Sequence, residues 1–297
     1  MIDPRQMRTY LAVCREGTIS GAARILNISQ PSVSIAIAQL ERALGTSLFG
    51  RSRTGILLTP AGTALFRRAE AMDALLRDAE QEVALTGRSV AGPLRIGGTP
   101  GALVSLVPEA IGRLDPAERL SLTILERPDL ELTELLRKGE IEIAVATTGI
   151  EAPPDDIEER GIARDPFALI VGRAHDPAPA TMSLRETVDW GWVLPQAAGA
   201  FHRQIEALFL AAEVPVPADV IRCDSLLTSK AIVQGSARVT LLPQGVVAAE
   251  LAIGVLRAIP LSDAAVTRNV GIRLLAHARL SALGASFVAA IEAGSNL

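Results

Sequence analysis

The first 45 residues carry apolar side chains at helical spacing in three successive blocks. In the first block, Met7, Leu11 and Cys14 fall at positions i, i+4 and i+7, which is the period of one helix face. Gly17 follows directly and is typical of the residue that ends such a helix. The pattern therefore predicts an amphipathic helix whose apolar face packs into a core.

The second and third blocks lie close together and are separated by a tight turn. Ser20 is a candidate N-cap for a short helix, and Asn27 tolerates the left-handed conformation that would end it. Ser29 is a candidate N-cap for a third helix that ends at Gly45, with Pro31 in its first turn, where a missing N–H costs nothing. The core face of this third helix is predicted to hold Val33, Ile37, Leu40 and Leu44. Two short helices joined in this way predict a helix-turn-helix.

The stretch "SLFGRSRTGILLTP", residues 47–60, predicts a strand, a basic loop and a second strand. Leu48 and Phe49 are expected to point inward, and Arg51 and Arg53 are expected in the loop. A hairpin of this kind directly after a helix-turn-helix is a wing.

From Thr59 onward the apolar spacing changes to alternating steps of four and three, the seam of a two-helix contact. The seam residues are Leu65, Ala69, Met72, Leu76, Ala79 and Val83. Charged residues surround the seam, which favours a contact with a second subunit, although a buried core helix would give the same spacing. The stretch "TGRSVAGP", residues 86–93, is typical of a hinge.

The rest of the chain alternates apolar strands with helical patterns. Strands are predicted at 94–98, 120–126, 140–146, 167–172, 192–194, 219–223, 239–242, 255–259 and 271–276. Helices are predicted around 103–114, 130–137, 201–212, 225–234, 244–251 and 279–293. This alternation predicts an α/β domain with a mostly parallel sheet covered on both faces.

The two parts of the chain differ in net charge. Residues 1–62 hold seven arginines against three acidic residues, a net charge of +4, whereas the whole chain has a net charge of −4. The remainder must then carry −8. A basic head on an acidic body predicts that only the head meets a polyanion such as DNA.

Several classes of protein are not predicted by this sequence. The two cysteines and three histidines have no metal-ligand spacing, so neither a metal site nor any other cofactor is expected. No apolar run reaches the ~18 residues of a membrane span, and no export signal is visible, which predicts a cytoplasmic protein without a membrane partner. A hydrolase would need a motif such as G-x-S-x-G, and an enzyme is not expected.

The residues 19–62, "ISGAARILNISQPSVSIAIAQLERALGTSLFGRSRTGILLTPAG", resemble the winged helix-turn-helix of LysR-type transcriptional regulators. The resemblance implies a DNA-binding domain at 1–62, a linker and dimerisation helix at 63–90, and an effector-binding domain at 91–297. It further implies that the last domain is of the periplasmic-binding-protein type, with subdomain I at 91–163 and 268–297 and subdomain II at 164–267. The implied assembly is a homodimer or homotetramer.

The third helix is expected to contact bases in the major groove and the wing to contact phosphates. The candidate DNA-binding residues are Gln30, Pro31, Ser32, Ser34, Ile35, Ala38, Arg51 and Arg53. The family often has a polar residue where Ile35 and Ala36 stand here, so a base contact by a long polar side chain is not expected at those two positions. The sequence therefore predicts readout by Gln30, by serine hydroxyls and by methyl contacts.

The effector-binding domain is expected to hold a small molecule at the ends of its strands, where open α/β sheets bind ligands. The candidate residues are Thr99, Pro100, Gly101, Thr147, Thr148, Phe201, His202, Arg203 and Ser225. A small carboxylate is one effector class that fits a helix N-terminus. Each threonine or serine could instead be a simple helix cap, and His202 and Arg203 could be solvated.

Two alternatives from other classes are weaker. "IGGTPG" after a strand is similar to a dinucleotide fingerprint, but Ile96 stands where the first glycine is needed and Pro100 disturbs the turn. A free solute-binding protein would leave the basic winged head unexplained. The sequence thus predicts a DNA-binding transcriptional regulator controlled by a small-molecule effector.

Overall fold

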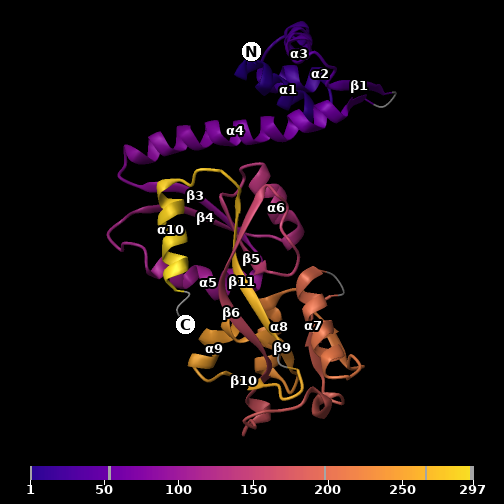
Figure 1. Ribbon diagram of the computed structural model, residues 1–297, viewed down its shortest axis with the longest axis vertical. Helices are drawn as coiled ribbons and strands as arrows, with labels where there is room; N and C mark the ends of the chain where they lie inside the picture. Colours follow the sequence, from indigo (N-terminus) through magenta and orange to yellow (C-terminus); the bar gives the residue numbers. More distant parts are fainter. Residues whose placement is uncertain (1, 53–54, 197–198, 265, 295–297) are drawn as a thin grey trace. The chain divides into compact units, whose positions relative to one another are not determined.

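The computed structural model describes residues 2–52, 55–196, 199–264 and 266–294 (Figure 1). Its internal contacts group the chain into two compact units, one of residues 1–88 with 137–140 and the other of the remaining residues. Each unit has its own hydrophobic core.

The first unit has the element order of a winged helix-turn-helix followed by a long helix, which confirms the predicted fold. Its described elements are α1 (Pro4–Glu16), α2 (Ile19–Leu26), α3 (Gln30–Leu44), β1 (Phe49–Ser52), β2 (Gly55–Leu58) and α4 (Pro60–Thr86). The helix ends fall where expected, because Gly17, Asn27 and Gly45 adopt the left-handed conformation with φ of 65°, 55° and 68°.

The predicted start of the second helix is wrong by two residues. Ser20 lies inside α2, and Thr18 is the N-cap, whose side chain accepts the Gly21 N–H at 3.0 Å. Thr18 comes directly after the left-handed Gly17 and already has the extended backbone that an N-cap needs, so the helix begins earlier.

A core under the helix-turn-helix fixes α3 to the hairpin and to α4. Tyr10 is fully buried and its hydroxyl donates to the Gly62 carbonyl oxygen at 2.7 Å. Glu41 on α3 accepts the Leu48 N–H at 2.7 Å, just before β1. A Cβ at Gly62 would lie 2.2 Å from the Leu48 carbonyl oxygen, so only glycine allows α4 to begin this close to the hairpin.

The hairpin pairs as predicted, but one arginine is placed differently. Arg51 is in strand β1 opposite Ile56, not in the connecting loop, because the ladder extends to the Ser52–Gly55 pair. Arg53 lies outside the described residues. Leu48 is buried as predicted, and Phe49 packs against Tyr10 with ring centroids 5.3 Å apart.

The first half of the apolar seam on α4 packs against residues of its own unit. Ala69 is fully buried, and Leu65 and Met72 pack against the core of the head. The prediction of a seam devoted to a second subunit is therefore wrong for these three residues, because α1 already covers them. Beyond Met72, Ala74 is still buried, but Leu75 and Val83 are exposed by 69% and 76%.

The second unit is an α/β domain built on a seven-stranded mixed sheet, with β7 and β8 forming a separate parallel pair. Its described strands are β3 (Ala91–Gly98), β4 (Leu120–Glu126), β5 (Ile143–Thr148), β6 (Ile157–Gly172), β7 (Trp192–Leu194), β8 (Val220–Arg222), β9 (Thr240–Pro243), β10 (Leu256–Pro260) and β11 (Thr267–Leu275). Its helices are α5 (Pro100–Gly112), α6 (Asp129–Arg137), η1 (Arg173–His175), η2 (Leu184–Thr187), α7 (Gly199–Ala211), α8 (Leu226–Gly235), η3 (Gln244–Val247), α9 (Ala248–Ala252) and α10 (Ala282–Ala293).

The sheet order is β10-β6-β11-β5-β3-β4, with β9 also paired to β6. β3 runs parallel to β4 and β5, but β6 and β11 run antiparallel to their neighbours. The expectation of a mostly parallel sheet is thus wrong. The chain leaves the first half of the unit along β6 and returns beside it along β11, and two strands that make one round trip are antiparallel (Figure 1).

Separate cores lie on the two faces of each half of this unit. In the first half, α5 and α10 cover one face of the sheet and α6 covers the other (Figure 1). In the second half, one core gathers around Trp192 and α7, and the other around Val233 and η3. The long strands β6 and β11 connect the two halves.

Candidate functional site

Helix α3 presents one face to the core and the opposite face to solvent. Val33, Ile37 and Leu40 are buried. All six candidate base-reading residues on the helix are exposed, namely Gln30, Pro31, Ser32, Ser34, Ile35 and Ala38. The structure thus places them together on one free helix face.

The N-terminus of α3 has its own hydrogen bonds. Ser29 Oγ accepts the Ser32 N–H at 3.2 Å and lies 2.8 Å from Ser32 Oγ, so the Ser32 hydroxyl already has one partner. Ile28, just before this cap, is 43% exposed. The sequence reasoning did not include Ile28, whose position in the turn gave no period to detect.

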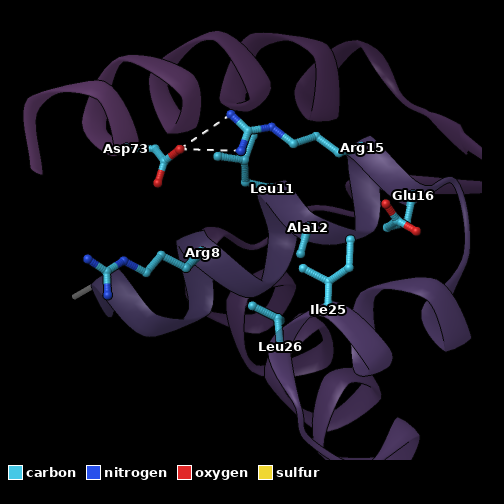
Figure 2. A pocket seen from close by; sticks show the side chains of 8 residues that line it. All are labelled: Arg8, Leu11, Ala12, Arg15, Glu16, Ile25, Leu26 and Asp73. Carbon is cyan, nitrogen blue, oxygen red and sulfur yellow. Dashed lines mark hydrogen bonds and ion pairs between the residues drawn. The ribbon is translucent and has the colours of Figure 1, made fainter. Parts of the chain in front are cut away.

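A groove with a volume of about 270 Å³ lies on another face of the first unit, between α1, α2 and α4. Figure 2 shows the apolar side chains Leu11, Ile25 and Leu26 along it, with charged residues at the rim. Arg15 on α1 donates two hydrogen bonds of 3.3 Å to Asp73 on α4 (Figure 2). Ile25 is 62% exposed, which makes this groove an apolar surface with a charged edge.

In the second unit, the first turn of α5 carries Thr99, Pro100 and Gly101. Thr99 is the N-cap, but its hydroxyl makes no capping hydrogen bond. Its backbone N–H donates to the Val145 carbonyl oxygen at 3.1 Å, which fixes the turn beside β5. The Thr99 hydroxyl is therefore not used to cap the helix.

Thr147 and Thr148 end the neighbouring strand β5. The Thr147 carbonyl oxygen accepts a hydrogen bond of 2.9 Å from Arg273. Thr148 is 4% exposed, and its hydroxyl is buried without a partner among the described residues. A buried hydroxyl without a hydrogen bond costs about 1–3 kcal/mol, which a ligand group reaching it would recover.

The candidates on α7 and α8 fall into two kinds. Phe201 stacks on Phe167 at 6.1 Å between ring centroids, and Ser225 caps α8 by accepting the Thr228 N–H at 3.2 Å, so both are engaged in the fold. His202 lies 3.1 Å from Glu206 through Nε2, and its Nδ1 is buried without a partner in the described part of the chain. Arg203, the remaining candidate, is exposed to solvent.

A buried ion pair that the sequence reasoning missed lies next to the first turn of α5. Arg268 on β11 donates to Asp165 on β6 at 2.8 Å, and the two side chains are 3% and 7% exposed. Arg268 also donates to the Gly101 carbonyl oxygen at 3.1 Å and to the Ser105 hydroxyl at 2.9 Å. Burial lowers the pKa of the Arg268 guanidinium, and attraction to Asp165 opposes that shift.

No helix of the described residues is both long enough and apolar enough to cross a membrane. Among the same residues, no three or more His, Cys, Asp or Glu side chains are grouped so as to hold a metal ion.

Comparisons with known proteins agree over nearly the whole chain. The family described as "LysR substrate binding domain" matches residues 87–295, and "Bacterial regulatory helix-turn-helix protein, lysR family" matches residues 4–63. A probable hydrogen peroxide-inducible genes activator of Mycobacterium avium is 31% identical, covering 82% of this chain and 78% of its own. The transcriptional regulator PcaQ of Agrobacterium fabrum is 25% identical over 93% of this chain and 90% of its own.

Among solved structures, ArgP from Mycobacterium tuberculosis has a similar fold, with a TM-score of 0.70 at 17% identity. The match covers 100% of this chain and 98% of that one.

Proposed function

The chain belongs to the LysR family of bacterial transcriptional regulators, and from this premise we propose how it reads DNA and senses its effector. Members of this family bind DNA through the winged helix-turn-helix and an effector through the α/β domain, and they are regulators rather than enzymes. The observation that carries the DNA proposal is the exposed face of α3 on a unit whose first 62 residues carry a net charge of +4.

We propose that Gln30 reads an adenine, while Ile35 and Ala38 pack on thymine methyl groups and the two serines contact phosphates or bases. Pro31 opens the helix beside them, and Arg51 and Arg53 supply phosphate contacts. The target is then rich in A·T pairs and is read partly through its shape.

A gel-shift series with single base-pair changes tests this assignment. Gln30→Ala is expected to weaken binding by about 1–3 kcal/mol at one base pair only. Arg51→Ala is expected to weaken binding to every sequence and to reduce the salt slope by about one unit. If Gln30→Ala leaves the base preference unchanged, α3 does not read the bases as we propose.

For the effector, Thr99, Pro100, Gly101, Thr147, Thr148, His202 and Arg203 are our candidate contacts, with a small carboxylate as the proposed class. The support is chemical. The Thr99 hydroxyl makes no cap bond, and Thr148 Oγ1 and His202 Nδ1 are buried without a described partner. Phe201 and Ser225 are retained in the proposal only as neighbours that shape the site, because both already have structural contacts.

A thermal-shift screen with small carboxylates, sugars and aromatic compounds finds the effector class, because a ligand that binds only the native state raises its melting temperature. Thr99→Val is expected to reduce that shift while DNA binding without effector persists. Loss of DNA binding in a folded Thr99→Val protein would show that the residue is assigned wrongly.

We also propose that the protein is a homodimer, or a tetramer of two dimers, acting in the cytoplasm. Two heads on repeated half-sites raise affinity without new contacts. The domain bounds of 1–62, 63–90 and 91–297, and the division of the last domain at 163/164 and 267/268, remain part of this proposal. Separate cores in the two halves of the second unit support that division.

The name of the Mycobacterium avium relative raises peroxide as an alternative signal. The cysteines do not favour it here. The sequence has only Cys14 and Cys223, one in each unit, and a resolving partner within the same unit is absent. A small-molecule effector is therefore our proposal.

A further inference from the structure

The Asp165–Arg268 pair lies where the two halves of the second unit are joined. Asp165 on β6 and Arg268 on β11 are register neighbours in the antiparallel ladder that connects the halves. The pair also contacts a helix from each half. Arg268 donates to the Gly101 carbonyl oxygen of α5 at 3.1 Å, and Asp165 accepts the Gly245 N–H of η3 at 2.8 Å. One ion pair thus joins two strands and two helices.

Glycines on both helices make this approach possible. A Cβ at Gly101 would lie 3.0 Å from Arg268 Nη1 and 3.3 Å from Val246 on η3. A Cβ at Gly245 would lie 2.9 Å from Asp165 Oδ2 and 3.0 Å from the Ser105 hydroxyl. The first turn of α5 and the first turn of η3 therefore meet the pair at positions where a side chain would not fit without movement.

Stability alone is a weak reason for such a pair. Removing two charges from water is expensive, and apolar residues of similar size often replace a buried ion pair without loss of stability. What apolar residues cannot replace is the set of directed hydrogen bonds to Gly101, Ser105 and Gly245. These bonds specify one alignment of α5 and η3.

We propose that Asp165 and Arg268 are positioning residues that hold the first turn of α5 on η3. They thereby fix the alignment of the two halves, which effector binding changes. This inference rests on the proposed effector site, because Thr99, Pro100 and Gly101 form that turn. A ligand that enters at Thr99 changes the same turn that Arg268 holds. The pair then couples occupancy of the site to the angle between the halves.

The first test is hydrogen exchange, followed by mass spectrometry, on the full-length protein without any ligand. Ser105→Ala removes the hydrogen bonds that the Ser105 hydroxyl makes with Arg268, Gly101 and Asp165, and it leaves both charges in place. We expect amides in 99–105 and 244–247 to exchange at least about tenfold faster, because these hydrogen bonds are lost, while β3 and β9 keep their rates. Unchanged exchange in both helical segments overturns the proposal.

A glycine pair supplies a matched comparison. Gly245→Ala places a methyl group against Asp165 and is expected to accelerate exchange in the same two segments. Gly235→Ala changes the last residue of α8, where a Cβ meets nothing within 4 Å, and is expected to leave them unchanged. Equal effects of the two substitutions would contradict the proposed contact.

The decisive variant separates stability from positioning. Asp165→Leu combined with Arg268→Met replaces the pair by apolar side chains and is expected to retain the melting temperature. Exchange in 99–105 and 244–247 is nevertheless expected to rise about tenfold, because the directed bonds are gone. If this double variant keeps wild-type protection, the pair serves only in packing and the proposal is overturned.

Failure of the proposed effector function looks different, since it appears as a wild-type protein that no compound in the thermal-shift screen stabilises.

Discussion

Cys14 is a thiol in surroundings that suppress its reactivity. Burial raises its pKa, repulsion from Glu70 adds to that shift, and the hydrogen bond with Tyr10 opposes it. The thiolate is the reactive form, so each unit of raised pKa lowers the reactive fraction roughly tenfold at neutral pH. We expect iodoacetamide to label Cys14 more slowly in the native protein than in urea, measured by mass spectrometry.

The same reasoning extends to peroxide. Mild peroxide is expected to leave promoter binding unchanged in a gel shift, and Cys223→Ser is expected to behave as the wild-type protein does. A peroxide response that disappears in Cys223→Ser would instead make oxidation the signal.

Single residues differ in how far the sequence predicts them. Gly17, Asn27 and Gly45 were predictable because a left-handed helix end depends on the residue itself. Ser225 was ambiguous between a helix cap and a ligand contact, and the structure makes it a cap. Asp165 and Arg268 were not predictable, because 103 positions separate them and no local pattern links the two.

At the scale of single elements, the exposed apolar residues of α4 predict how two copies of the chain assemble. Leu75, Ala79 and Val83 lie at i, i+4 and i+8 on the half of α4 that the head does not cover, and all three are exposed. A second copy's α4 is the partner that our dimer proposal assigns to this stripe. Val83→Glu puts a charge into that contact and is expected to shift the mass toward the monomer in light scattering.

Gln81→Glu serves as the control, because residue 81 is exposed on the opposite face of α4 and the substitution adds the same charge. It is expected to leave the mass unchanged. If both variants keep the mass of the wild-type protein, the dimer is formed elsewhere.

The seam of α4 shows what periodicity can and cannot establish. Spacing of four and three predicts a helix with an apolar stripe, and α4 runs through the whole predicted seam. It does not say what covers the stripe. Ala69 and Met72 pack against the head, whereas Val83 in the same stripe is exposed, and only the tertiary structure separates them. The same limit applies to β6 and β11, because the sequence pattern of a strand does not show whether it pairs parallel or antiparallel.

For the whole molecule, separate cores predict separate unfolding. Residues 1–88 and the α/β unit each bury their own apolar cluster, so we expect two transitions in calorimetry. Duplex DNA binds only the first unit in our proposal. At about 100 times its Kd it should stabilise that unit by ~2.7 kcal/mol and leave the second transition in place.

The control for this experiment is Gln30→Ala with the same duplex, which should reduce the shift of the first transition alone. A single transition that moves as a whole when DNA is added would show that the two units unfold together.

The paired strands β6 and β11 have a consequence for the history of the fold. Pro166 and Thr267 are neighbours in the ladder, so the segment between them leaves and re-enters the first half at adjacent points. A segment whose two ends lie this close is topologically an insertion, which a host domain can gain, exchange or lose without rerouting the remaining chain. Grafting the 167–266 segment of one relative into another is then a route to new effector specificities on an unchanged DNA-reading head.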